Sequence, residues 1–435
     1  MMRSMTYDEA VAALEGALKF GMNPSLEPIA AMCTAMGEPQ KRYRCIQVAG
    51  TNGKSSTTRM IAALLRAQGL RVGLYVSPHL VKYPERIEID GRIVGDEAFA
   101  RGIEAAFDAA ARAGVQATEF ELLTAAALWL FAQEGVDWAV LECGLGGRWD
   151  ATSVVNPQVA VITGVALEHT AILGDTIEKI AGEKAAIIKP GSRAVFAHDL
   201  AAREVFEQQA QDVEAPYSYA EPDATRPFDD ELALMPVYQR SNLATALVAV
   251  EVTLGHAPSE ASVRAALDEL VIPGRFEVLR RDPLVIIDAA HNPQSAHALA
   301  GELRRFSGAK GAAGDVAERF PHEPGAPVAL PCEIRTMSSA VLPAKQLTLL
   351  IGVLADKDAR GIVRELCPLF SRVVVTASSS SRAIPADELA GIVEDECGVR
   401  PEVAQSIGEA RGLLVNEPIL ATGSITVAGE VKDIW

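Results

Sequence analysis

The sequence predicts an α/β protein with two domains, each built on a mainly parallel sheet, the second smaller and Rossmann-like. Three observations support this. The chain has 435 residues, and a single core stops growing at about 250 to 300 residues. Short apolar runs alternate with helical patterns, which is typical of parallel sheets covered by helices. The first run ends in a glycine-rich turn with a lysine, as phosphate-binding loops do.

The elements of the first domain follow in order along the chain. We expect helices at 7–19, 176–188 and 241–253, and strands at 45–49, 71–76, 137–143 and 158–165. The apolar segment 122–132 is too short to cross a bilayer, which takes about 20 residues. It is therefore expected to form a buried helix.

The second domain begins after a breaker. A linker is expected at 270–283, where Pro273 and Gly274 interrupt the pattern. Three strand-loop-helix units follow, and a last strand is expected within 418–431. The predicted domains are 1–275, carrying the phosphate loop, and 276–435. The segment 306–346 is rich in Gly, Ala and Pro without a clear period, which predicts an irregular insertion.

Composition and charge limit the classes of partner. With 49% hydrophobic and 22% charged residues, the chain has the composition of a globular protein. A net charge of -17 repels nucleic acid and anionic lipid, so neither nucleic acid nor a membrane is an expected partner. Six cysteines without a C-x-x-C pair favour reduced thiols, and the start of the chain does not resemble a secretory signal. We therefore expect a cytoplasmic protein.

The segment VAGTNGKSSTT, residues 48–58, predicts a site for a polyphosphate. Its backbone can wrap an anion, Lys54 supplies a positive charge, and the helix that follows contributes its N-terminal N–H groups. The candidate binding residues are Gly50, Thr51, Asn52, Gly53, Lys54, Ser55 and Ser56. Val48 stands where the strict pattern has Gly, so this is a variant loop. A plain glycine turn is the alternative.

Three residues near the ends of predicted strands could hold the divalent cation that a nucleotide phosphate requires. Glu142 lies near the end of the predicted strand 137–143, while Ser77 and His169 follow two other predicted strands. The carboxyl ends of parallel strands meet at one edge of the sheet. Taken separately, Ser77 could cap a turn and His169 could be a hydrogen-bonded residue at a strand end. Together they predict a metal site.

Four further candidates are weak in isolation. Lys184 lies on a predicted helix, where a surface lysine is the ordinary interpretation. Arg275, in the linker, could reach a phosphate. Asp288 and His291 lie in the loop DAAHNP, which follows a strand of the second domain.

With these residues identified, the chain closely resembles the folylpolyglutamate synthase and dihydrofolate synthase family, within the Mur ligase superfamily of ATP-dependent amide-forming ligases. The resemblance covers nearly the whole sequence. It is carried by the motifs FGMNPSLEPI, VAGTNGKSS, VSPHLVKYPERIEIDG, FELLTAAAL, LECGLGGRWDAT, LEHTAILGDTIEKIAGEKAAIIKPG, PGRFEV, DAAHNP, DKD, SSSRAIPADEL and TGSITVAGE.

The resemblance implies a first domain that acts as a phosphate-loop ATPase with magnesium, and a second domain that closes over it. Ser77, Glu142 and His169 match the family's magnesium ligands. Lys184 matches a lysine that is carbamylated in the family and helps to hold a second Mg²⁺. The implied catalytic residues are Lys54, Glu142, His169 and Lys184.

The resemblance also implies the substrate positions. Asn242 and Arg275 match nucleotide-binding residues, while Asp288 and His291 match residues that reach the ribose and phosphates of ATP. Other segments would lie near a pterin, namely Phe120, 20–27 and 77–83. The implied protein is a monomer with small-molecule substrates: ATP, L-glutamate, and dihydropteroate or a reduced folate.

The implied reaction agrees with the charges. A substrate carboxylate attacks the γ-phosphate of ATP to give ADP and an acyl phosphate, and the amine of glutamate then displaces phosphate to form an amide. Several anions must be neutralised in one place, which requires Lys54, Arg275 and Mg²⁺ in a protein of net charge -17.

Three departures from the family pattern are visible. The lysine of the loop is followed by Ser55 and Ser56 rather than Gly and Ser. Glu168 precedes His169 where Asp is common. The segment 307–345 is longer and less regular than usual.

Other functions stay open at this point. A phosphate-loop NTPase acting as a motor, transporter subunit or kinase would leave the second domain unexplained. A nucleotide-binding regulator would require that the changes at Ser55 and Glu168 prevent metal binding. A ligase of the same architecture could act on another carboxylate, such as a cell-wall precursor.

Overall fold

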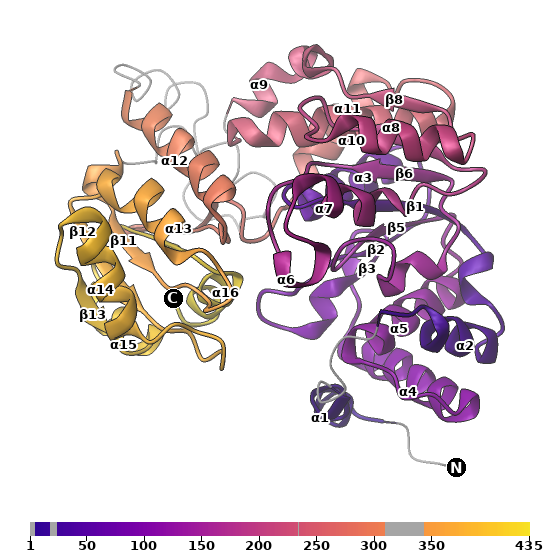
Figure 1. The fold of residues 1–435 in the computed structure, drawn as a ribbon, viewed down its shortest axis with the longest axis horizontal. Helices are drawn as coiled ribbons and strands as arrows, with labels where there is room; N and C mark the ends of the chain where they lie inside the picture. The colour runs from indigo at the N-terminus through magenta and orange to yellow at the C-terminus, as the bar shows by residue number, and fades with distance from the viewer. Residues whose placement is uncertain (1–4, 18–23, 234, 309–342) are drawn as a thin grey trace, which may run out of the picture. The chain divides into compact units, whose positions relative to one another are not determined.

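The computed structural model describes residues 5–17, 24–233, 235–308 and 343–435 (Figure 1). Contacts divide the chain into two compact units. Unit 1 comprises Met1–Pro227 and Ser241–Leu270, and unit 2 comprises Phe228–Arg240 and Val271–Trp435. Most of the predicted insertion, residues 309–342, lies outside the described residues. The predicted α/β class is confirmed, because each unit is built on a mainly parallel sheet with helices.

Unit 1 contains an eight-stranded sheet in the order β4-β3-β2-β5-β1-β6-β7-β8. The strands are β1 (Arg44–Ala49), β2 (Val72–Tyr75), β3 (Ile87–Ile89), β4 (Arg92–Ile93), β5 (Trp138–Glu142), β6 (Val159–Ile162), β7 (Arg193–Phe196) and β8 (Tyr217–Tyr219). Among the described strands of this sheet, the β2–β3 and β3–β4 pairs are antiparallel and the other pairs are parallel. The four predicted strands are confirmed as β1, β2, β5 and β6; all four are buried almost throughout, as expected of central parallel strands.

Helices surround this sheet. Those of unit 1 are α1 (Tyr7–Ala17), α2 (Glu27–Ala35), α3 (Lys54–Arg66), α4 (Asp96–Ala113), α5 (Glu119–Glu134), α6 (Thr170–Leu173), α7 (Ile177–Ala185), α8 (Arg203–Asp212) and α11 (Glu260–Glu269). In Figure 1, α2, α4 and α5 lie together, and their apolar side chains form one core with β5. The predicted buried helix at 122–132 is confirmed as part of α5. Helix α10 (Val237–Leu254) begins in unit 2 and ends in unit 1.

Unit 2 contains a six-stranded sheet in the order β13-β12-β11-β14-β10-β9. The strands are β9 (Glu277–Arg281), β10 (Leu284–Ile287), β11 (Thr348–Ile351), β12 (Arg372–Thr376), β13 (Glu402–Ala404) and β14 (Ile419–Thr422). The helices are α9 (Asp229–Leu232), α12 (Pro293–Gly308), α13 (Ala359–Leu366), α14 (Ala386–Cys397), α15 (Ile407–Leu414) and α16 (Ile425–Ile434). Figure 1 shows α12, α13 and α14 in succession along the sheet.

Two sequence expectations in unit 2 were wrong in part. Residues 277–281, expected within the linker, form strand β9, which pairs antiparallel with β10 at the edge of the sheet. Its charged residues prevented us from predicting a strand there, because an edge strand tolerates charge that a central strand does not. Residues 418–431 form a strand and the start of α16 rather than a strand alone.

Short 3-10 helices connect several of these elements. They are Pro39–Lys41, Tyr83–Arg86, Ala151–Val154, Pro222–Phe228, Ala344–Gln346 and Cys367–Leu369. Within the part of the chain that the structure describes, no helix is both long and apolar enough to cross a membrane.

Candidate functional site

The turn between β1 and α3 has the geometry of a phosphate-binding loop. It leaves the carboxyl end of β1 and enters α3 at Lys54, with Gly53 as the N-cap at φ 82°. A Cβ on Gly53 would lie 2.5 Å from the side-chain oxygen of Asn242, and a Cβ on Gly50 would lie 2.0 Å from Thr163 Oγ1. Both glycines are therefore required: Gly53 by its left-handed backbone and both by close packing.

The neighbouring strand fixes the loop. The amide of Thr51 donates to the carbonyl of Gly164 at 2.8 Å, and the hydroxyl of Thr163 donates to the carbonyl of Asn52 at 2.7 Å. Since Thr163 and Gly164 directly follow β6, the loop is held at the carboxyl edge of the sheet. A rigid loop of this kind can present its backbone to an anion without ordering cost.

Two lysines converge on the same carbonyl. Lys54 Nζ donates to the carbonyls of Gly50 and Thr51, both at 3.1 Å, and Lys184 Nζ donates to that of Gly50 at 2.8 Å. Lys184 is buried, contrary to the ordinary interpretation of a surface lysine. Burial, and then the positive charge of Lys54, lowers the pKa of Lys184 to about 7.

Glu142 lies at the end of β5 and is almost fully buried. Its carboxylate accepts a hydrogen bond from the hydroxyl of Ser55 at 2.8 Å and another from the backbone amide of Ser77 at 3.2 Å. Ser55, the departure from the family pattern, thus contacts one of the predicted metal ligands directly. The structure therefore brings together two of the three predicted metal ligands, Ser77 and Glu142, beside the first turn of α3.

His169 is the third predicted ligand. It lies at the N-terminal end of α6 with φ 51°, an uncommon backbone conformation for a residue with a side chain. Its side chain is 35% exposed, and Nε2 lies 3.8 Å from a carboxylate oxygen of Glu168. Glu168 also favours the charged form of Lys184. Glu168 therefore belongs to the electrostatic surroundings of Lys184, and His169 lies next to Glu168.

The donor set fits magnesium. Among the residues that the structure describes, no group of three or more His, Cys, Asp or Glu side chains could hold a metal ion by itself. Mg²⁺ is usually held by one or two carboxylates together with substrate phosphates and water. The buried carboxylate of Glu142 with the hydroxyl of Ser55, next to a phosphate-binding loop, matches that requirement.

The predicted residues of unit 2 have different surroundings. Asp288, directly after β10, is almost fully buried. One carboxylate oxygen accepts from the amide of Phe276 at 2.8 Å and the hydroxyl of Tyr238 at 3.3 Å, and the other accepts from the amide of Ala290 at 2.8 Å. Burial raises the pKa of Asp288, while Arg275 and these hydrogen bonds act in the opposite direction. The Nδ1 of His291 lies 2.8 Å from the carbonyl oxygen of Ala289.

An aromatic region lies near the segments predicted to contact a pterin. A Cβ on Gly144 would lie 2.7 Å from the ring of Phe120, which places that ring against the loop after β5. His79 and Tyr83 are in ring contact, and Arg86 donates to His79 Nδ1 at 2.9 Å. Burial, and then Arg86, lowers the pKa of His79 to about 3, so this imidazole is neutral. Residues 20–23, also predicted there, lie outside the described residues.

Sequence reasoning assigned no role to a hydroxyl cluster in unit 2. Thr426 Oγ1 lies 2.9 Å from the hydroxyl of Ser378 and 3.0 Å from that of Ser424. The cluster follows the carboxyl ends of β12 and β14, and Ser424 caps α16. The serine run and the motif TGSITVAGE were the signals that could have found it, since ligands of open α/β sheets bind at this edge.

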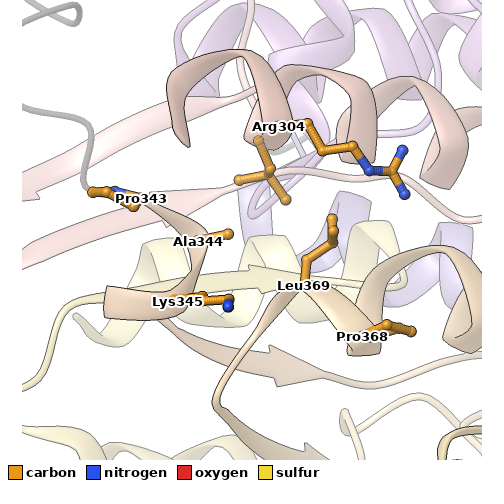
Figure 2. A pocket seen from close by; sticks show the side chains of 7 residues that line it. Arg304, Pro343, Ala344, Lys345, Pro368 and Leu369 are labelled. Atoms are coloured by element: carbon orange, nitrogen blue, oxygen red, sulfur yellow. The ribbon is translucent and has the colours of Figure 1, made fainter. Parts of the chain in front are cut away.

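A pocket of about 490 Å³ lies elsewhere in unit 2. Figure 2 shows its lining side chains, which come from α12, the 3-10 helix Cys367–Leu369 and residues 343–345, which precede β11. The lining residues are Leu303, Arg304, Pro343, Ala344, Lys345, Pro368 and Leu369. No predicted site residue is among them, so we do not assign this pocket to the reaction.

Comparison with known proteins defines the class. The Mur ligase middle domain matches residues 48–232. The dihydrofolate synthase/folylpolyglutamate synthase of Mycobacterium tuberculosis is 33% identical over 95% of this chain and 90% of its own length. The probable bifunctional folylpolyglutamate synthase/dihydropteroate synthases of Halobacterium salinarum and Haloferax volcanii are 32% identical, and this chain spans about half of their length.

Solved structures agree. The folylpolyglutamate synthase of Mycobacterium tuberculosis complexed with ADP is similar with a TM-score of 0.81 and 30% identity over 98% of both chains. A bifunctional folylpolyglutamate synthase/dihydrofolate synthase with Mn, AMPPNP and L-glutamate bound is similar with a TM-score of 0.78 and 26% identity, covering 98% of this chain and 97% of that one. The fold and the matched Mur ligase middle domain place the chain in the Mur ligase superfamily. More narrowly, the chain belongs to the dihydrofolate synthase/folylpolyglutamate synthase family, whose members are ATP-dependent ligases.

Proposed function

We propose that this protein joins L-glutamate to dihydropteroate, to a reduced folate, or to both, through an acyl phosphate formed with ATP. The observation that carries the proposal is the loop Gly50–Ser56, where two lysines meet one carbonyl beside the buried carboxylate of Glu142. Such a loop binds a triphosphate and a cation together. The names of the relatives supply the substrate class.

The loop explains how the chain would receive ATP. The backbone amides of the turn and the N-terminal end of α3 would bind the phosphates. Lys54, bonded to the carbonyls of Gly50 and Thr51, would turn to a phosphate oxygen as a mobile point charge. The acid substrate would then attack the γ-phosphate, and the amine of glutamate would displace phosphate from the acyl phosphate.

The metal ligands remain part of the proposal. Ser77, Glu142 and His169 would hold Mg²⁺, which, when bound, neutralises charge on the transferring phosphate. Lys184 would be carbamylated and help to hold a second ion. Its burial and lowered pKa support this, because the neutral amine is the form that adds carbon dioxide, losing a proton as the carbamate forms.

Residues of unit 2 would complete the substrate sites. The nucleotide would be bound by Arg275, Asp288 and His291 together with Asn242 of unit 1. The hydroxyl cluster of Ser378, Ser424 and Thr426 would accept the carboxylates of glutamate, because it combines hydroxyl donors with the N-terminal end of α16. A monomeric state and a cytoplasmic location remain predictions.

Phosphate release from ATP tests the proposal. It should be measured with Mg²⁺ and with dihydropteroate, a reduced folate and L-glutamate each present or omitted. Release that requires glutamate together with one of the pterins, with a matching amide product by mass spectrometry, supports the proposal. Release without an acid or an amine indicates an NTPase. No release with either pterin, but release with another carboxylate and an amino acid, indicates a different Mur-type ligase.

A further inference from the structure

We infer that Asp288 and Tyr238 are positioning residues, which fix two of the three segments that connect unit 2 to unit 1 and thereby the nucleotide-site residues on those two segments. The inference rests on the proposed function in one respect, the assignment of ATP to the loop Gly50–Ser56. It gives Asp288 a positioning role through Tyr238 and Phe276, in addition to the place in the nucleotide site proposed above.

The carboxylate of Asp288 is occupied on both oxygens. It accepts from the amides of Phe276 and Ala290 at 2.8 Å each and from the hydroxyl of Tyr238 at 3.3 Å. These donors come from three separate stretches of the chain. Because the carboxylate is buried, losing one donor would leave a charged oxygen without its compensation, which is costly.

Two of these stretches lie where the chain passes between the units. The chain leaves unit 1 after Pro227, returns after Arg240 and leaves again after Leu270. Tyr238 lies two residues before the second crossing, and Phe276 follows the third. Asp288 therefore bonds to the connecting segment at Arg240 and to the one that follows Leu270, at one point inside unit 2.

The connecting segment that follows Leu270 is also fixed in an uncommon backbone conformation. Phe276 has φ 52° and is almost fully buried, and the amide of Ala289 donates to the carbonyl of Gly274 at 2.8 Å. A left-handed residue with a bulky side chain persists only where its surroundings determine it. Arg275, between these two bonded positions, is thus held by its neighbours on both sides.

The connecting segment at Arg240 is part of α10, and this helix also contacts the phosphate loop. Tyr238 and Asn242 are both on α10 and are four residues apart, so they lie on one face of the helix, one turn from each other. Asn242 packs against Gly53, where an added Cβ would approach its side-chain oxygen to 2.5 Å. A helix turn is stiff, so a shift of Tyr238 would be transmitted to the contact between Asn242 and the loop.

The test is the variant Tyr238→Phe, which removes one hydroxyl and keeps the ring. We expect the Kd for AMPPNP, measured by calorimetry on the full chain, to rise about fivefold to tenfold. This is less than the full effect of losing one hydrogen bond to a charged group, because the change reaches the nucleotide site only through α10. Hydrogen exchange at the amide of Phe276 should accelerate as well. Tyr43→Phe is the matched control, because its hydroxyl donates to the carbonyl of Leu128 at 3.0 Å within unit 1, away from these segments.

The double variant Tyr238→Phe/Asp288→Asn sharpens the test. If both residues act through one contact, it should bind AMPPNP no more weakly than Asp288→Asn alone. The inference is overturned if Tyr238→Phe shows the same Kd and the same exchange as Tyr43→Phe. A failure of the proposed function is seen separately, as absence of glutamate-dependent turnover in the unmutated protein, while binding and exchange still decide the role of Tyr238.

Discussion

The loops after β1 in unit 1 and after β10 in unit 2 both lie at the carboxyl edge of a parallel sheet, yet their charged groups are used differently. In the first loop, cationic side chains donate to backbone carbonyls. In the second, an anionic side chain accepts from backbone amides and a tyrosine. A lysine can exchange a carbonyl for a phosphate oxygen, whereas Asp288 cannot leave without uncovering buried donors. The first loop is built to respond to a ligand, and the second to keep its shape.

Lys54→Ala should have the largest effect and should separate activity from stability. We expect turnover to fall by about a thousandfold or more, because a point charge on the phosphates is lost. The melting temperature should stay near that of the unmutated protein, because the carbonyl of Gly50 keeps its hydrogen bond from Lys184 and a like charge next to Lys184 is removed. Lys179→Ala, which removes an exposed lysine paired with Asp175, is the control. Unchanged phosphate release in Lys54→Ala would remove the loop from the mechanism.

Glu142→Gln should have the next largest effect. The side chain keeps its size. The amide oxygen of Gln can accept from the backbone amide of Ser77, and its nitrogen can donate to the hydroxyl of Ser55, so the fold should persist. We expect turnover to fall about a hundredfold and the magnesium midpoint of activity to move to higher concentration. Glu97→Gln, at an exposed carboxylate on α4, serves for comparison. A magnesium titration identical to that of the unmutated protein would show that Glu142 is not a ligand.

Asp288→Asn should reduce stability, which Lys54→Ala is expected to leave unchanged. The amide nitrogen cannot accept from a backbone N–H, so we expect the free energy of unfolding to fall by about 1 to 3 kcal/mol. Chemical denaturation monitored by fluorescence would measure this loss. His291→Ala, in the same loop but with a part-buried imidazole, should cost less. Equal stability of Asp288→Asn and the unmutated protein would contradict the contrast between the two loops.

Ser55→Ala should have the smallest effect. It removes the hydroxyl that donates to Glu142 and keeps the helix, because Ala has the highest helix propensity. We expect a shift of about threefold in the magnesium midpoint, with KM for ATP within about twofold of its original value, since one hydrogen bond changes near the metal only. A loss as large as that of Glu142→Gln would make Ser55 an essential ligand rather than a modulator.

Local patterns predicted much of unit 1. The apolar runs of β1, β2, β5 and β6 are buried on both faces, so their hydrophobicity marks them. The glycines and lysine of the loop led to the prediction of a phosphate site, because those residue types have few other uses together.

Contacts between distant parts of the sequence could not be predicted. The approach of Asn242 to Gly53 and the convergence of Lys54 and Lys184 on Gly50 depend on how strands and helices assemble. Strand β9 was missed because its charged residues are tolerated at a sheet edge. Tyr238 was missed because a tyrosine near a helix start has no pattern that marks its hydroxyl as the donor to a buried carboxylate.

Helix α10 also limits where the chain could be divided into fragments. Its first turn belongs to unit 2, although the rest of the helix lies within unit 1. A fragment beginning near residue 271 would contain the whole six-stranded sheet but would lack the tyrosine that donates to Asp288. Truncation at the predicted linker, residues 270–283, would therefore yield an incomplete unit 2.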